Sequence, residues 1–139
     1  MDLMGPYTTR TPTKTHELRA MTVMDPATSW FEIAPIVHPN SNSTQRASDG
    51  CWLARYPRPQ CAGYDNGNEF KWLFKELCEN FRLISKNNMD FNPQGNAVLE
   101  CVHQVLGNAL CIFKLDKCKL DEENLWEPFM TMVAYAIYI

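Results

Sequence analysis

The most constraining feature of this chain is a short apolar segment that runs into a tight turn and then into a helical pattern, at residues 60–81. The segment 60–64 has the length of a strand, and the turn at 65–67 contains Asn-Gly. Over residues 68–81 the apolar residues recur at intervals of three and four, which predicts a helix with one buried face. This strand-turn-helix unit is typical of α/β folds. It places Asp65 at the carboxyl end of a strand, where open α/β sheets carry their ligand sites.

A second carboxylate is predicted on a helix farther along the chain. Asn-Pro at 92–93 precedes a helical pattern over 94–113, and Glu100 lies about one turn inside it with His103 one turn on. The predicted packed side of this helix comprises Val98, Val102, Val105, Leu106, Ala109, Leu110 and Phe113. Two acids held by different elements can share metal ions, because hard cations such as Mg²⁺ take carboxylate oxygens as ligands.

Both acids stand within longer motifs. D-N-G-N-E-F occupies 65–70, and N-P-Q-G-N-A-V-L-E-C-V-H-Q-V-L occupies 92–106. Glu100 follows Asp65 by 35 positions (100 minus 65). In this order and spacing the motifs resemble the catalytic core of DDE-type integrases of the retroviral superfamily, most closely those of gypsy-type LTR retrotransposons.

The resemblance requires a first aspartate upstream, on a strand and followed by Gly-Pro. Asp2, with Gly-Pro at 5–6, precedes Asp65 by 63 positions (65 minus 2). Residues 1–7 are therefore predicted to be the end of the first strand, stopped by Gly-Pro. Family members carry several residues ahead of this aspartate, so we expect a truncated first strand in a chain that looks cut at both ends.

The resemblance implies that Asp2, Asp65 and Glu100 are the catalytic residues and the ligands of two Mg²⁺ or Mn²⁺ ions. Asp2 would hold both ions, Asp65 one and Glu100 the other. Two such ions stabilise the attacking and leaving oxygens of a phosphodiester. The implied reaction is metal-dependent 3′-end processing of DNA and strand transfer (DNA integration), by a nucleotidyltransferase that acts in the nucleus as a homo-oligomer.

Further polar residues near the predicted site could contact DNA. They are Asn92, Gln94, Asn96, His103 and Lys71. Each also has a structural interpretation. The amides could cap the helix, His103 could be a packed helix residue, and Lys71 could belong to a solvated helix face.

Two other acids are predicted to lie outside the metal site. Asp25 precedes Pro26, a pair that favours a turn, and we interpret Asp25 as a turn former. Glu69 matches a family acid outside the metal-binding three, at a helix start where the backbone dipole favours a negative charge.

The resemblance implies one RNase H-like α/β domain over 1–139, with a mixed five-stranded sheet flanked by helices. We expect three antiparallel strands at 1–7, 16–25 and 29–37, then parallel strands at 60–64 and 82–86, with the fourth strand beside the first. Residues 8–14 are predicted to be a connector, 87–93 a loop and 124–139 a last helix.

The first helix, around 38–56, is predicted to be degenerate. Only Ala47, Cys51, Leu53 and Ala54 could form its apolar face. Gly50 weakens it by about 1 kcal/mol relative to alanine. We expect a shortened helix or a loop there.

Composition narrows the function classes. The 139 residues are 45% apolar and 12% aromatic, which indicates a globular domain. A net charge of −3 is unusual for an enzyme that gains affinity by neutralising phosphates. DNA binding must therefore be local or supplied by segments outside this chain.

Cysteine and hydropathy patterns exclude other classes. The six cysteines contain no Cys-x-x-Cys pair and the three histidines are scattered, so we interpret the cysteines as reduced packing residues, not zinc ligands. No secretory signal is evident, and 124–139 is shorter than the ~20 residues that cross a bilayer. The chain is therefore expected to be intracellular, without a membrane partner.

Two alternatives to an integrase core stay open. One is a catalytically inactive remnant or domesticated interaction domain that keeps the fold, since truncation could have abolished activity. The other is a related RNase H-fold nuclease or transposase. The resemblance covers nearly the whole chain but includes neither the N-terminal zinc-binding module nor the C-terminal DNA-binding module of the family.

Overall fold

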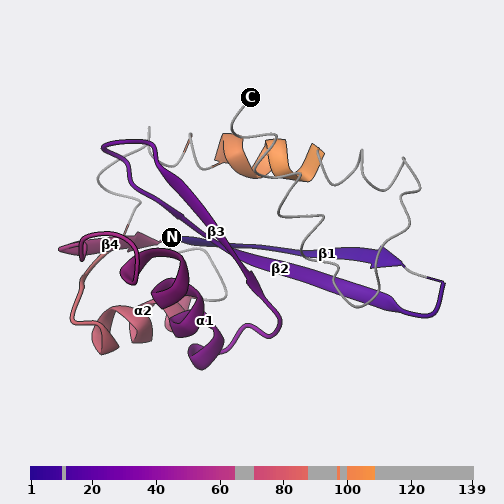
Figure 1. Cartoon of the computed structure of the whole chain (residues 1–139), viewed down its shortest axis with the longest axis horizontal. Helices are drawn as coiled ribbons and strands as arrows, with labels where there is room; N and C mark the ends of the chain where they lie inside the picture. The colour runs from indigo at the N-terminus through magenta and orange to yellow at the C-terminus, as the bar shows by residue number, and fades with distance from the viewer. Residues whose placement is uncertain (11, 65–70, 88–96, 98–99, 109–139) are drawn as a thin grey trace.

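The computed structural model describes residues 1–10, 12–64, 71–87, 97 and 100–108 of the chain (Figure 1). Within them the chain forms a mixed α/β arrangement of three antiparallel strands, a parallel pair and helices. The predicted helix at 124–139 lies outside the described residues, as do most of the predicted loop at 87–93 and parts of the helix at 94–113.

The antiparallel sheet has the order β1-β2-β3, from β1 (Asp2–Arg10), β2 (Thr15–Met24) and β3 (Phe31–Ile36). This confirms the three predicted antiparallel strands. Asp2 pairs with Thr22, and Thr22 pairs with Ile33, so these residues form one row across the sheet. Since successive side chains on a strand point to opposite faces, the row fixes which residues share a face with Asp2.

The prediction that Gly-Pro stops the first strand was wrong. β1 continues through Gly5 and Pro6 to Arg10, so residues 8–10 belong to the strand and not to a connector. The pairing with β2 shifts between Met4 and Tyr7. Such a bulge tolerates a proline, which has no N–H to donate. Gly5 adopts a φ of 97°, which glycine allows at little cost.

The parallel pair consists of β4 (Cys61–Tyr64) and β5 (Ile84–Asn87), joined through α2 (Lys71–Asn80). The amino group of Met1 donates to the carbonyl oxygen of Gly63 at 2.7 Å. The residue before β1 is therefore hydrogen-bonded to β4. Among the described residues the strands form two sheets, β1-β2-β3 and β4-β5, and the predicted pairing of β1 with β4 in one sheet is not among their ladders.

The segment around 38–56 forms a shortened helix, one of the two predicted outcomes. α1 (Ser41–Ser48) continues into a π-helical turn, η1 (Asp49–Leu53), and the Asn40 side chain caps its start by accepting from the Ser43 N–H at 2.8 Å. The predicted apolar face was partly wrong, because Ala54 is exposed and the buried residues are Thr44, Ser48 and Cys51. Small side chains allow close packing on the sheet without a strong apolar pattern.

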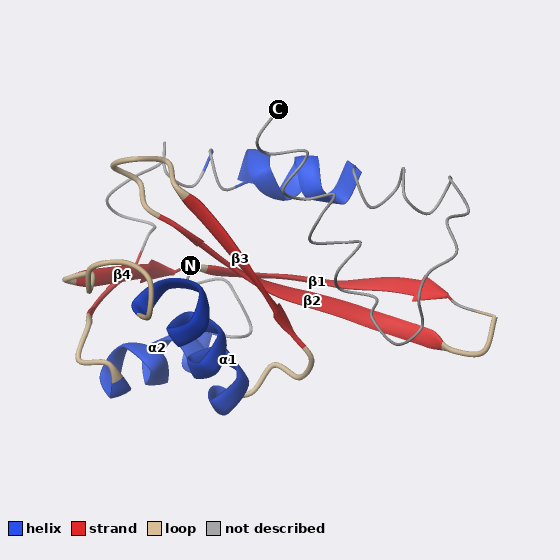
Figure 2. Cartoon of the chain, in the orientation of Figure 1, coloured by secondary structure: helices blue, strands red, loops and turns tan. Residues whose placement is uncertain are grey.

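Helices cover both faces of the antiparallel strands. Figure 2 shows α1 and α2 on one side and the helical segment 100–108 on the other. The core on the α1 and α2 side comprises Met21, Val23, Ala34, Ile36, Cys51, Ala62, Tyr64, Phe74 and Cys78. The core on the other side comprises Met4, Phe31 and Leu106. No helix among the described residues is long and apolar enough to span a membrane.

The apolar patterns of the two amphipathic helices hold in most positions. Leu73, Phe74, Leu77 and Cys78 of α2 are buried, as predicted. In the 100–108 segment Leu106 is buried, but Val105 is 39% exposed, so its assignment to the packed side was wrong.

Arg82, predicted to begin the fifth strand, instead terminates α2. Its φ is 53°. Its N–H donates to the carbonyl oxygen of Glu79, and the Leu83 N–H donates to the carbonyl oxygen of Cys78 at 2.8 Å. This pair of bonds is the Schellman motif, in which a left-handed residue caps the last carbonyls of a helix.

Replacing Arg82 with glycine is expected to stabilise the fold by about 0.5–1 kcal/mol, because a left-handed φ is costly for an L side chain and glycine adopts it freely. Arg82→Ala, which retains the strain, serves as the control and should change stability by less than about 0.5 kcal/mol. Urea unfolding measures both. Equal effects of the two variants would contradict the assigned role of φ.

Candidate functional site

Asp2 lies at the first position of β1, with its side chain 26% exposed. Its two carboxylate oxygens have different neighbours. The Leu3 N–H donates to Oδ1 at 2.8 Å, and Nδ1 of His103 lies 3.5 Å from Oδ2. The carboxylate is thus oriented from two sides, and the solvent-accessible part can still meet a ligand.

His103 links the 100–108 helix to the antiparallel sheet. Its Nε2 lies 3.0 Å from Oγ1 of Thr22, and that hydroxyl is also 3.2 Å from the carbonyl oxygen of Asp2. Thr22 is fully buried and pairs with Asp2 across β1 and β2. One imidazole therefore contacts both strands, at the position where the two strands align.

Glu100 stands one helical turn before His103 and is exposed. Burial lowers the pKa of His103, an effect that the negative charges of Asp2 and Glu100 oppose and that the amino group of Met1 reinforces. Glu100 is thus near enough for its charge to act on the imidazole. Of the predicted site residues, the structure places His103 in contact with Asp2, and Glu100 lies one helical turn from His103 on the same helix.

The other predicted site residues lie either outside the described residues or away from Asp2. Asp65, Asn92, Gln94 and Asn96 lie outside the described residues, as does Glu69. Asp65 follows Tyr64, the last residue of β4, directly in the sequence. Lys71 is exposed at the start of α2 and lines a surface hollow of about 320 Å³ with Lys75 and Ser85. It belongs to the helical layer on the opposite face of the sheet from His103.

The donor chemistry of the site suits a hard divalent cation. Asp2 and Glu100 offer carboxylate oxygens, which Mg²⁺ and Mn²⁺ prefer. Within the described part of the chain, no group of three or more His, Cys, Asp and Glu side chains is placed to hold a metal ion. The third predicted ligand, Asp65, lies beyond that part.

Thr22 is the site residue that sequence reasoning missed. It belongs to no motif and sits among apolar residues of a predicted strand. Only the pairing register of β1 and β2 reveals that it aligns with Asp2.

Asp25, an acid that could be mistaken for a metal ligand, is confirmed as a turn former. Its carboxylate accepts from the Ala27 N–H at 3.1 Å and from the Thr28 hydroxyl at 2.6 Å. These hydrogen bonds lower the pKa of Asp25, and the bond from Thr28 has the largest effect.

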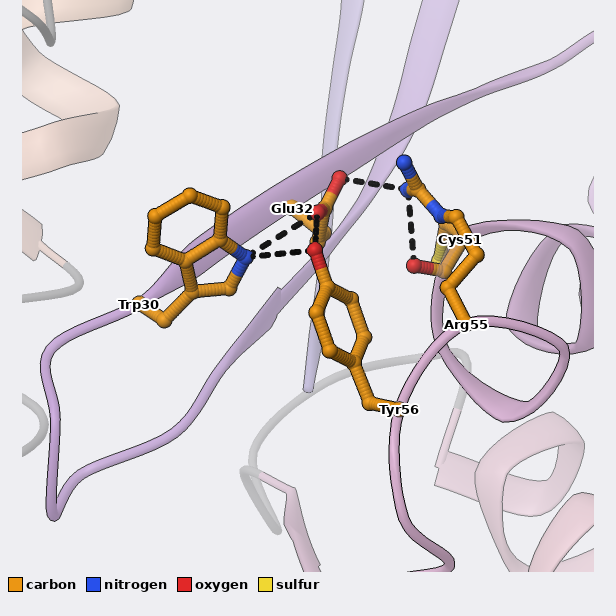
Figure 3. A network of polar contacts seen from close by, with 5 residues as sticks. All are labelled: Trp30, Glu32, Cys51, Arg55 and Tyr56. Carbon is orange, nitrogen blue, oxygen red and sulfur yellow. Dashed lines mark hydrogen bonds and ion pairs between the residues drawn. The ribbon is translucent and has the colours of Figure 1, made fainter.

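A polar network centred on Glu32 connects β3 to the segment after η1 (Figure 3). Glu32 accepts from the Trp30 indole at 3.0 Å, from the Tyr56 hydroxyl and from Arg55 at 2.7 Å. Along β3, Glu32 shares its face with Ala34, in the core on the α1 and α2 side. The network is therefore structural and lies away from Asp2.

The four cysteines within the described residues, Cys51, Cys61, Cys78 and Cys101, are all free. Burial raises the pKa of the Cys51 thiol to about 11, and the nearby Glu32 charge adds to this effect. Cys51 is thus a protonated packing residue at neutral pH.

Neither a scan against protein-family models nor a search of curated proteins found a match to this chain.

Proposed function

We propose that this chain is the catalytic core of a DDE-type integrase, a polynucleotidyl transferase that processes and joins DNA ends. The observation that supports this most is the 3.5 Å contact between His103 and Asp2. These residues come from motifs at opposite ends of the resemblance, and the contact places the Glu100 helix over the strand that begins with Asp2.

The order of elements supports an RNase H-like fold for the proposed core. Three antiparallel strands are followed by a helix, a strand, a helix and a parallel strand, and then by the 100–108 helical segment. The hydrogen bond from Met1 to Gly63 brings the start of β1 next to β4. We propose that all five strands form one mixed sheet with the order β3-β2-β1-β4-β5.

In this proposal Asp2, Asp65 and Glu100 hold two Mg²⁺ or Mn²⁺ ions. When bound, such ions offset charge on phosphodiester oxygens and lower the pKa of a coordinated water. The chain itself orients the donors. The Leu3 N–H and His103 fix the Asp2 carboxylate, while Glu100 projects from an exposed position toward solvent. Asn92, Gln94 and Asn96 are the proposed DNA contacts, in a protein that works as a nuclear homo-oligomer. Lys71 and His103 are no longer proposed as DNA contacts, because Lys71 lies on the opposite face of the sheet (Figure 2) and both ring nitrogens of His103 face Asp2 and Thr22.

A catalytically inactive domain that retains this fold is the second candidate. It is favoured by the net charge of −3, because DNA-binding proteins normally gain affinity from lysine and arginine. The two candidates differ in one measurable property, the metal-dependent joining of DNA ends.

The test is strand transfer by the purified 139-residue chain, using a labelled duplex with recessed 3′ ends, a plasmid target and Mg²⁺. Glu100→Gln is expected to reduce joining by more than the ~10–100-fold typical of residues that only support a metal ligand. Because Glu100 is exposed, this substitution should leave the fold intact.

Glu79→Gln is the matched control, since Glu79 is an exposed helical glutamate on α2, and it should join DNA at the wild-type rate. Failure of the wild-type chain to join DNA would overturn the proposal in favour of the inactive domain. Cleavage of RNA in RNA–DNA hybrids without joining would instead indicate a nuclease.

A further inference from the structure

The contact between the 100–108 helix and the sheet combines apolar packing with one polar link. Leu106 is buried against Met4 and Phe31, and Val102 packs beside them. Apolar contacts of this kind are not directional and tolerate small rotations and shifts of a helix. The polar link is the Thr22, His103 and Asp2 cluster, whose distances and angles are more restrictive.

We infer that Thr22 and His103 form a positioning pair that fixes the Asp2 carboxylate and sets the rotation of the helix that carries Glu100. This inference rests on the proposed function, in which Asp2 and Glu100 hold the metal ions. His103 and Glu100 are three positions apart, so they share one side of the helix. Anchoring His103 to Thr22 therefore fixes Glu100 as well.

The proton arrangement follows from the neighbours of the imidazole. The negative Asp2 carboxylate faces Nδ1 and favours a proton on that nitrogen. Nε2 is then an acceptor, and the Thr22 hydroxyl, 3.0 Å away, donates to it. The same hydroxyl is within donating distance of the Asp2 carbonyl oxygen at 3.2 Å, and the shorter 3.0 Å separation favours Nε2 of His103 as its acceptor in this tautomer.

The position of Thr22 argues against a purely structural role for its hydroxyl. Thr22 is fully buried, and its neighbours on the strand, Met21 and Val23, are also buried. Valine has nearly the same shape as threonine and suits a buried strand position. What threonine adds here is a directed hydrogen bond to His103.

The experiment compares Thr22→Val, which removes the hydroxyl, with Thr22→Ser, which keeps it. Mn²⁺ alone is titrated into the full chain by calorimetry, and strand transfer is measured in parallel. Thr22→Val should weaken Mn²⁺ binding and slow joining by ~10–100-fold, and Thr22→Ser should stay within ~3-fold of wild type. Combining Thr22→Val with His103→Leu should cause no greater loss than His103→Leu alone.

Thr44→Val provides a matched control. Thr44 is equally buried, and its hydroxyl donates to the Asn40 carbonyl oxygen at 2.9 Å within α1, on the other face of the sheet. It should reduce thermal stability about as much as Thr22→Val without affecting Mn²⁺ affinity. Equal Mn²⁺ affinity in wild type, Thr22→Val and Thr44→Val would overturn the positioning pair.

A readout independent of metal and activity separates this inference from the proposed function. Nitrogen-15 NMR of the imidazole at pH 8 should find the proton of His103 on Nδ1 in the wild type, and Thr22→Val should shift it toward Nε2. A wild-type proton on Nε2 would overturn the pair even if DNA is joined. A wild-type chain that neither binds Mn²⁺ nor joins DNA would overturn the proposed function, and the NMR result would still decide whether the pair exists.

Discussion

Phe74→Ala is expected to destabilise the protein by about 3–5 kcal/mol, the range for removing a buried aromatic ring. Phe74 is fully buried on α2, and its ring stacks on that of Tyr64 with the centroids 5.7 Å apart. The substitution therefore removes the contact that holds α2 against the end of β4. Since most domains are stable by only about 5–15 kcal/mol, a large part of the total would be lost.

Urea unfolding followed by circular dichroism measures this loss, and the slope of the transition shows whether the native state stays compact. The control is Trp72→Ala on the same helix. Trp72 is 56% exposed, so its removal should change stability by no more than about 0.5 kcal/mol. If both aromatic substitutions cost the same, the predicted burial of the α2 face would be incorrect.

Gly5→Ala is the second large effect, with an expected cost of about 2–4 kcal/mol. At a φ of 97° a Cβ on residue 5 would lie 2.5 Å from the carbonyl oxygen of Leu18 and 3.1 Å from the nitrogen of Tyr7. Both are backbone atoms of the paired strands, so neither can move aside without breaking the ladder. The midpoint of urea unfolding should fall accordingly.

Gly50→Ala is the matched control for Gly5→Ala. No described atom lies within 4 Å of the added Cβ, apart from neighbours in its own helix. Alanine there should stabilise the protein by up to about 1 kcal/mol, because glycine is a poor helix former. Opposite signs for the two variants are the expected result. A stable Gly5→Ala variant would mean that β1 does not pair with β2 through this bulge.

Residue patterns predicted the elements whose structure depends on local spacing. The three-and-four periodicity in α2 identified Leu73, Phe74, Leu77 and Cys78 correctly, because burial of one helix face is visible in a single segment. The ends of the antiparallel strands were predicted to within two residues, except at the C-terminal end of β1, which extends three residues beyond the predicted end.

The errors have in common a dependence on distant parts of the chain or on unusual backbone geometry. Gly-Pro is locally a strand stop, and only pairing with β2 across a bulge allows β1 to continue through it. The helical segment at 41–53 buries Thr44 and Ser48, whose polar side chains give no apolar signal. The Thr44 hydroxyl is satisfied within its own helix, by the Asn40 carbonyl oxygen.

In the candidate site, too, the residues in local motifs were predictable and the residue placed by a distant contact was not. Motif spacing predicted Asp2 and His103 as site residues, and the structure places these two residues in contact. Thr22 could not be predicted, because its contact with His103 depends on the strand register and on the packing of a helix 81 positions away. Sequence motifs identify candidate site residues, whereas the residues that contact them are fixed by tertiary structure.

The Glu32 network has a consequence for the route of the chain between η1 and β4. That connection has no regular secondary structure, yet Arg55 and Tyr56 are bound to Glu32 on β3. These hydrogen bonds attach the connection to β3 shortly before the chain enters β4, the strand that precedes Asp65 in the sequence. An acid on β3 therefore helps to fix the start of β4, although the two strands belong to different sheets among the described residues.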